Sequence, residues 1–170
     1  MQLPNPETLL SDISKKITAL IKPDTAMIGI HSGGVWLMER ILANLEQEVP
    51  HGTLDAAFYR DDFAQRGLKN QSQAANITFD VQGKHIILID DIFYTGRTAR
   101  AAINELFDFG RPASVSLAVL INRGGAELPI QPNIVGANLA LRSNQRLQLW
   151  QTTQGILNLA LENTEDADHV

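Results

Sequence analysis

IILIDDIFYTGRT, residues 86–98, gives the strongest indication of the fold. It begins with an apolar run, which is typical of a strand buried on both faces of a parallel sheet. Asp90 and Asp91 end this predicted strand, and a short loop then opens a helix predicted over Thr98–Phe109. The stretch therefore predicts one strand–loop–helix unit of an α/β fold.

The loop inside this unit has the composition of an anion-binding site. Thr95, Gly96 and Thr98 can present backbone N–H groups and hydroxyls to a phosphate at the helix N-terminus. Asp90 and Asp91 can hold two vicinal hydroxyls, a divalent cation, or both. A sugar phosphate with free 2- and 3-hydroxyls would satisfy both halves of the loop. Neither the GxxxxGK[ST] pattern of a P-loop nor GxGxxG occurs in the chain.

Strands and helices alternate on both sides of this unit. A helix is predicted after Asn5-Pro6-Glu7, and a second one runs from Val35, with Trp36 expected in its core-facing stripe. Predicted strands cover 26–30, 54–60, 85–89, 115–121, 134–136, 147–149 and 156–161. We therefore expect an α/β protein with a central, mostly parallel sheet flanked by helices. Its ligands should bind beyond the carboxyl ends of the strands, where HSGG (31–34), the acid pair (90–91) and NRGG (122–125) are expected to meet.

Length and composition limit the class of protein. The 170 residues, 44% of them hydrophobic, fit a single domain over 1–161 followed by an acidic tail over 162–170. Cysteine is absent, which excludes disulfides and thiolate metal sites, and we expect no metal site built from protein side chains alone. No apolar run approaches the roughly 18 residues of a membrane span, and no signal peptide is recognisable, so a cytoplasmic protein without membrane contact is expected. The polar segment 61–76 is long for a loop and is predicted to be a lid.

The complete stretch 86–98 resembles the motif with which type I phosphoribosyltransferases bind phosphoribosyl pyrophosphate (PRPP). In that motif hydrophobic residues, two acids and a Thr-Gly-x-Thr loop follow one another. Further segments resemble PyrR, the family of pyrimidine-operon regulators that also act as uracil phosphoribosyltransferases: YRDD (59–62), GRP (110–112), LAVL (117–120) and RGGAELPI (123–130). The resemblance covers roughly residues 8–161. It implies a type I phosphoribosyltransferase fold with a small hood and a flexible loop.

The resemblance also implies an activity, the conversion of uracil and PRPP to UMP and pyrophosphate, with regulation of pyrimidine biosynthesis genes as a second role. The PRPP-binding residues would be Asp90, Asp91, Ile92, Phe93, Tyr94, Thr95, Gly96, Arg97 and Thr98. Within this set the two acids would hold the ribose hydroxyls, and Asp91 would also assist proton removal. The residues from Tyr94 onward would wrap the 5-phosphate.

Other site residues follow from the same resemblance. His31, Ser32, Gly33 and Gly34 form the loop expected to face pyrophosphate. Arg60, at the start of the flexible segment, would neutralise the leaving pyrophosphate during catalysis. Arg123 and Leu147 fall where the family binds the nucleotide or base. Mg²⁺ would arrive with PRPP, and the implied assembly is a homodimer or homotetramer.

The chain departs from the family pattern in two places. PyrR relatives usually read Thr-Arg-Gly where Ser32-Gly33-Gly34 stands here, which removes one charge-assisted bond worth about 1.5–3 kcal/mol. RNA-binding members carry basic residues at positions that here hold Gly125, Ala126, Gln131 and Ala137. With a net charge of −5 as well, we do not expect RNA binding. Two alternatives remain open: a nucleotide-sensing regulator with little or no catalysis, and a purine-salvage phosphoribosyltransferase.

Overall fold

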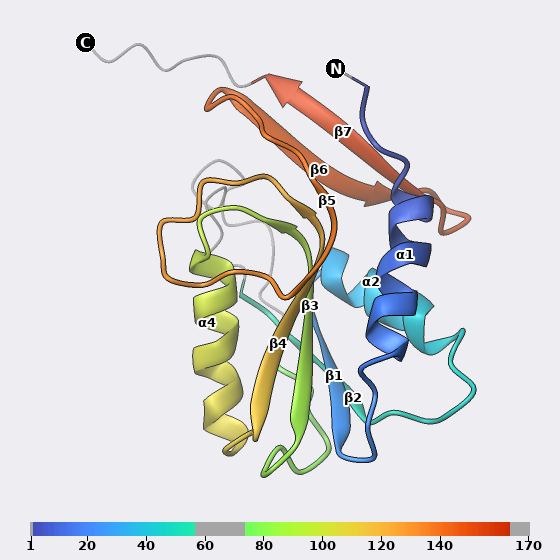
Figure 1. The fold of residues 1–170 in the computed structure, drawn as a ribbon, viewed down its shortest axis with the longest axis vertical. Helices are drawn as coiled ribbons and strands as arrows, with labels where there is room; N and C mark the ends of the chain where they lie inside the picture. The colour runs from blue at the N-terminus through green and yellow to red at the C-terminus, as the bar shows by residue number, and fades with distance from the viewer. Residues whose placement is uncertain (1, 57–73, 164–170) are drawn as a thin grey trace.

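Parallel strands form the centre of the molecule (Figure 1). The computed structural model describes residues 2–56 and 74–163. Its central sheet has the order β2-β1-β3-β4-β5, and every neighbouring pair is parallel. The strands are β1 (Thr25–Ile30), β2 (His51–Leu54), β3 (His85–Phe93), β4 (Ser114–Asn122) and β5 (Ile134–Asn138). The expected α/β class with a central parallel sheet is confirmed.

The middle strand, β3, is longer than the apolar run alone predicted. It continues through the acid pair to Phe93, and its backbone pairs with β4 as far as Phe93 opposite Asn122. The ladder to β4 keeps the acid pair in extended conformation, so the prediction that the strand ends at Asp90 and Asp91 was wrong. The two carboxylates consequently belong to the second half of a buried strand.

Helices cover both faces of the sheet, as Figure 1 shows. On one face α1 (Pro6–Thr18) and α2 (Gly33–Leu42) contribute most of their buried residues to a single apolar cluster with the sheet. On the other face α4 (Arg97–Leu106) packs through Ala102 and Leu106, and a 3-10 turn, η2 (Phe107–Phe109), completes the helix that was predicted to reach Phe109. The start of α1 is the predicted one, because the Asn5 side chain accepts bonds from the N–H groups of Glu7 and Thr8.

The edge strand β2 was misplaced by the sequence analysis, which put a strand over 54–60. The observed strand ends at Leu54, where the predicted one was to begin, and residues 57–60 lie outside the described part of the chain. Its limits follow from its partner, because His51 to Leu54 pair with Met27 to Ile30 of β1. Gly52 lies so close to Asn76 that a Cβ there would come within 2.7 Å of the Asn76 carbonyl oxygen. Because β2 is held by contacts with its neighbours, its own sequence shows little of the alternation of apolar and polar residues by which strands are predicted.

The last two strands form a hairpin apart from the central sheet. β6 (Gln145–Gln151) and β7 (Leu157–Asn163) pair antiparallel, and Figure 1 shows them beyond the carboxyl ends of the parallel strands. Leu147, Leu149 and Leu157 are buried in the same cluster as α1 and α2. Residues 164–170, most of the predicted tail, lie outside the described residues, as does most of the predicted lid. Within the described residues, none of the helices has the length and apolar character needed to cross a bilayer.

Candidate functional site

A cavity of about 230 Å³ lies between the carboxyl edge of the central sheet and the hairpin. Its lining comes from four places: the loop after β1 together with α2, the end of β3 with the start of α4, the residue after β4, and β6. These elements meet because the carboxyl ends of parallel strands share one edge of a sheet. The predicted convergence of the segments at 31–34, 90–91 and 122–125 is therefore observed.

Most of the residues predicted for the site line this cavity. They are Ser32, Gly33, Asp90, Asp91, Ile92, Phe93, Tyr94, Thr95, Gly96, Thr98, Arg123 and Leu147. Among the described residues, His31, Gly34 and Arg97 belong to the predicted set but do not line the cavity. Arg60 lies outside the described residues. The contiguous stretch 90–98 thus contributes more lining residues than any other segment.

Asp90 and Asp91 line the cavity and are buried, with exposed fractions of 3% and 6%. Asp90 accepts a 2.9 Å bond from the backbone N–H of Asp91, and Asp91 accepts one of the same length from the N–H of Ile92. These local bonds orient both side chains. Two oriented carboxylates at a cavity suit the hydroxyls of a ribose, which can donate hydrogen bonds to them.

The start of α4 forms the second chemical feature of the cavity. Gly96, at φ +92°, caps the helix in the left-handed conformation, which glycine adopts without steric cost. Thr95 is buried, and its hydroxyl accepts a 3.3 Å bond from the N–H of Arg97. Because no side chain of Gly96 covers the first turn, its backbone N–H groups can approach an anion. The composition of the loop predicted a phosphate subsite at this turn, and its backbone geometry suits one.

The start of α2 packs tightly against β3. A Cβ on Gly33 would lie 2.3 Å from the carboxylate oxygen Oδ2 of Asp91, and one on Gly34 would lie 2.1 Å from the carbonyl oxygen of Ile89. Both glycines are therefore required by the close approach of the helix start to the strand that carries the acid pair. The peptide bond between His31 and Ser32, just before these glycines, is cis.

Arg123 joins the site from the residue after β4. Its guanidinium lies 3.8 Å from the centroid of the Tyr94 ring, and its Nη2 donates a 3.1 Å bond to the carbonyl of Gln145. Within the described part of the chain, the buried Nε of Arg123 has no hydrogen-bond partner. A buried donor without a partner costs about 1–3 kcal/mol, and a ligand acceptor would remove that cost.

Five lining residues were not predicted from the sequence: Trp36, Ala99, Arg146, Gln148 and Leu149. Trp36 was assigned to the core, and it does pack against the apolar cluster while also lining the cavity. The three β6 residues stand beside Leu147, for which only the resemblance gave a role. Strand alternation around Leu147 predicts which residues share a face, but not that the hairpin lies over the site.

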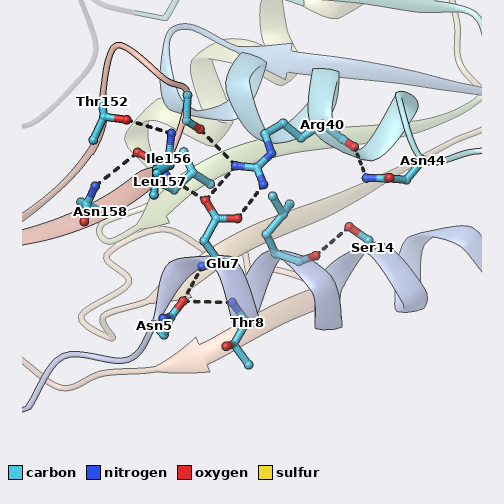
Figure 2. Close-up of polar contacts among 12 residues, drawn as sticks. Asn5, Glu7, Thr8, Ser14, Arg40, Asn44, Thr152, Ile156, Leu157 and Asn158 are labelled. Carbon is cyan, nitrogen blue, oxygen red and sulfur yellow. Dashed lines mark hydrogen bonds and ion pairs between the residues drawn. The ribbon is translucent and has the colours of Figure 1, made fainter.

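The hairpin is attached to the helical layer by a polar cluster around Glu7 and Arg40 (Figure 2). Arg40 donates to both carboxylate oxygens of Glu7, at 2.8 and 2.5 Å, and to the carbonyl of Gly155 in the hairpin turn at 3.2 Å. Glu7 in turn accepts a 2.9 Å bond from the N–H of Leu157. The hydrogen bond from Arg40 lowers the pKa of Glu7, and the same contact raises the pKa of Arg40. One ion pair therefore joins α1, α2 and the hairpin.

The residues of the cavity also fit a magnesium ion that enters the site bound to the phosphates of a ligand. No group of three or more His, Cys, Asp or Glu side chains among the described residues has the geometry to hold a metal ion alone. Mg²⁺ is commonly bound through one or two carboxylates together with substrate phosphates. Asp90 and Asp91 supply such carboxylates, next to the phosphate-binding turn.

Comparison with protein families and curated proteins places the chain among known sequences. The family model described as the phosphoribosyl transferase domain matches residues 3–143. Proteins named "Bifunctional protein PyrR" are similar over most of their length. The one from Pseudomonas fluorescens Pf-5 is 47% identical over 88% of this chain and 91% of its own. Those from Pseudomonas entomophila and Nitrosococcus oceani are 44% and 46% identical, over 97% and 88% of this chain and 96% and 90% of their own.

Solved structures share the fold at low sequence identity. A hypoxanthine-guanine phosphoribosyltransferase from Bacillus anthracis superposes with a TM-score of 0.63 at 16% identity, covering 82% of this chain and 83% of its own. A purine phosphoribosyltransferase from Pyrococcus horikoshii superposes with a TM-score of 0.60 at 23% identity, covering 79% and 82%. At these identities the likeness concerns the fold, and it matches the observed parallel sheet with its flanking helices.

Proposed function

The chain belongs to the phosphoribosyltransferase family and, within it, to the PyrR proteins, and from this premise we propose that it transfers the phosphoribosyl group of PRPP to uracil. The products would be UMP and pyrophosphate. One observation carries the proposal: two buried carboxylates and a glycine-capped helix N-terminus line the same cavity. This pairing suits a ribose 5-phosphate, with its hydroxyls and its phosphate at opposite ends.

We assign a separate part of PRPP to each part of the cavity. Asp90 and Asp91 would accept hydrogen bonds from the ribose hydroxyls. The turn formed by Tyr94, Thr95, Gly96 and Thr98 would bind the 5-phosphate through backbone N–H groups and hydroxyls. The loop of His31, Ser32, Gly33 and Gly34 would face pyrophosphate with its backbone, since the packing against Asp91 leaves no room for a side chain on Gly33.

The base would lie near Arg123 and β6. The unpartnered Nε–H of Arg123 can donate to a carbonyl oxygen of the pyrimidine or to an oxygen of the nucleotide. Leu147 and Leu149, both buried, provide apolar surface for one side of a ring. Uracil rather than a purine is the base that the resemblance to the PyrR family implies, and base preference is therefore part of the test below.

In the reaction, a bond forms between uracil N1 and the anomeric carbon of the ribose while the bond to pyrophosphate breaks. Positive charge develops on the sugar and negative charge on the leaving group, so preorganised charges and dipoles around them lower the barrier. Mg²⁺ bound with PRPP would supply Lewis-acid neutralisation of the pyrophosphate oxygens. Arg60 would add a positive charge from the segment outside the described residues. Asp91 would orient the ribose and assist removal of the N1 proton.

The departure at Gly33 bears on how much catalysis this chain performs. An arginine expected in the family pattern is absent there, and no cation replaces it from the same position. We therefore expect transfer to depend strongly on Mg²⁺ and on Arg60.

We further propose a role in regulating pyrimidine biosynthesis genes that does not use RNA binding, because the basic residues of the RNA-binding members are missing. A homodimer or homotetramer is the assembly that we propose.

The decisive experiment is UMP formation from uracil, PRPP and Mg²⁺, with hypoxanthine as a parallel base. The Asp91→Asn variant should lose at least about a hundredfold in turnover if the carboxylate acts as assigned, since both a charge-assisted bond and proton removal are affected. Asp24→Asn is the matched control, because Asp24 is an exposed acid that pairs with Lys84 away from the cavity. Turnover of hypoxanthine but not uracil would replace the proposal by purine salvage. Binding of UMP without turnover of any base would replace it by a nucleotide sensor.

A further inference from the structure

The loop that follows β4, residues 123–128, lies directly against the phosphate-binding turn at 94–97. Two backbone hydrogen bonds connect the two segments, and a third joins the loop to Phe93, the residue just before the turn. Arg123 donates its N–H to the carbonyl of Phe93 at 3.0 Å, and Glu127 and Leu128 donate theirs to the carbonyl of Thr95 at 2.9 and 3.3 Å. The turn that would hold the 5-phosphate is thus supported from outside by a second loop.

Side chains connect the same two segments. Arg97 and Glu127 form an ion pair, and Arg123 stacks over the ring of Tyr94. Gly125, at φ +84°, lies against the ring of Tyr94, since a Cβ there would come within 2.8 Å of that ring. We call the contacts between 94–97 and 123–128 the latch.

The position of Arg97 within the latch separates it from its neighbours in sequence. Thr95, Gly96 and Thr98 line the cavity, whereas Arg97, within the described part of the chain, does not. Its guanidinium is paired with the carboxylate of Glu127, and the two side chains are 49% and 51% exposed. An arginine that bound the 5-phosphate directly would be expected among the lining residues.

We propose that Arg97 and Glu127 are positioning residues, which hold the phosphate-binding turn in place through the latch, and that Arg97 does not contact the phosphate. The inference deepens the proposed function and rests on it, because the ligand of the turn is taken to be the phosphate of UMP or PRPP. Release of the ion pair loosens the turn without removing any group that touches the ligand. Both partners of the pair therefore affect the same binding step.

Magnitudes distinguish this role from direct contact. An exposed ion pair contributes at most about a fivefold change in an equilibrium constant. Loss of a charge-assisted bond to a phosphate instead changes affinity by about tenfold to more than a hundredfold. A latch thus predicts small and similar losses for both partners. A direct contact predicts a large loss at Arg97 and a gain at Glu127, whose carboxylate would otherwise compete with phosphate for the arginine.

The test measures UMP affinity by calorimetry in the wild type and in matched variants. Arg97→Met and Glu127→Gln should each weaken binding by about two- to fivefold, and Arg97→Lys should lose less than Arg97→Met. The charge swap that combines Arg97→Glu with Glu127→Arg should return the affinity to within about twofold of the wild type. Arg100→Met is the matched control, as an exposed arginine on the same helix, and should leave the affinity unchanged. Stronger binding by Glu127→Gln, or loss of binding in the swap, would overturn the proposal.

A second readout does not depend on the ligand. Amide hydrogen exchange at Glu127 and Leu128 should be faster in the ligand-free Arg97→Met and Glu127→Gln proteins than in the wild type, and normal in the charge swap. In steady-state assays both single variants should raise KM for PRPP while kcat stays within about twofold of the wild type. If the wild type binds no UMP, the proposed function fails while the exchange measurement still decides whether the pair holds the two loops together. Unchanged exchange in both single variants would refute the latch itself.

Discussion

The contact between Gly33 and Asp91 links two parts of the site that are far apart in the sequence. The first turn of α2 reaches the acid pair so closely that the carboxylate of Asp91 occupies the space where a side chain on Gly33 would begin. The identity of residue 33 therefore affects the orientation of Asp91 as well as the charge near pyrophosphate. A substitution at this position is expected to act through the carboxylate.

We expect Gly33→Ala to weaken UMP and PRPP binding by about tenfold or more, because the added Cβ displaces a charged group that bonds to ribose. The measurement is calorimetric titration with UMP. Gly83→Ala is the matched control, since Gly83 has φ +73° but no atom within 4 Å of the place where a Cβ would stand, and it lies away from the cavity. It should lower stability by about 1–2 kcal/mol and leave the affinity unchanged. Equal affinities for wild type and Gly33→Ala would contradict the role given to this packing.

Glu105 illustrates an electrostatic cost at a single residue. Burial raises the pKa of this carboxyl above its ordinary value of 4.5, and the charges of Asp55 and Asp108 raise it further. The folded chain thus holds this proton more tightly than the unfolded chain. The charged form consequently lowers stability at neutral pH, and this penalty disappears as the pH falls through the raised pKa.

Glu105→Gln should therefore increase the free energy of unfolding at pH 7 by up to about 0.5 kcal/mol. The gain should vanish in acid, where the wild-type carboxyl is also neutral. Urea denaturation at a series of pH values measures both effects. Glu39→Gln, which changes an exposed acid of α2, serves as the control and should show no such pH-dependent gain. A destabilised Glu105→Gln protein at pH 7 would contradict the expectation.

The individual site residues that could be predicted from the sequence lie within one short stretch of the chain. Asp90, Thr95 and Gly96 were recognisable because their chemistry lies within one short stretch whose strand and helix are close in the chain. The outward pairing of Arg97 was not predictable, since its partner Glu127 comes from a loop that reaches the turn only in the folded molecule. Trp36 shows the same limit, because an apolar stripe on a helix does not reveal that its edge borders a cavity.

Among the elements, the β6–β7 hairpin depends most on distant contacts. It shares no ladder with the central sheet in the described part of the chain, and it is attached through buried leucines and the Glu7–Arg40 pair. Its strands were predictable from alternating residues, but its place over the site was not. The edge strand β2 was misplaced for a related reason, since β1 sets its register.

Arg40→Met should lower the free energy of unfolding by about 1 kcal/mol, because Arg40 and Glu7 are partly exposed, at 38% and 34%, and water weakens the pair. The loss should be visible in urea denaturation and in faster exchange of hairpin amides. Arg111→Met is the matched control, because Arg111 is exposed and its guanidinium contacts the carbonyl and the ring of Phe107, only four residues away in the sequence. Similar stability losses in the two variants would argue against a special role for the pair.

The same pair should make stability depend on pH. The pKa of Glu7 lies below its ordinary value of 4.5, so the folded chain releases this proton more readily than the unfolded chain. The stabilisation that the Glu7–Arg40 pair provides is fully present above pH 4.5, the ordinary pKa of the carboxyl. It is lost as the pH falls through the lowered pKa of Glu7. The difference in stability between wild type and Glu7→Gln should accordingly be constant from neutral pH down to about pH 5.5 and shrink below pH 4.5. A difference that persists in stronger acid would show that Glu7 contributes through packing instead.

For the whole molecule, the site is assembled from segments spread over most of the chain, from Ser32 to Leu149. A ligand that contacts all of them stabilises the folded state against the unfolded one. The fold class was predictable from the alternation of strands and helices, and the family resemblance added the ligand that we propose. The roof of the cavity was not predictable, because it depends on how the hairpin packs.

UMP at a concentration of about 100 times its dissociation constant should raise the free energy of unfolding by about 2.7 kcal/mol. For a chain of this length the melting temperature should rise by roughly 5–10 °C. Thermal denaturation with and without UMP measures the shift, with GMP as the control nucleotide. A larger shift with GMP would favour a purine substrate, and no shift with either would contradict nucleotide binding.

The bond between Glu7 and the backbone of Leu157 spans 150 positions in the sequence. During synthesis the first helix emerges early, whereas its hairpin partner leaves the ribosome only after about 150 further residues have been made, several seconds later at about 5–20 residues per second. The parallel sheet can form before that moment, but the cavity still lacks its roof. A nascent chain therefore gains its complete binding site in a final docking step, and a chain that stops before the hairpin would hold the carboxylates without the surface that covers them.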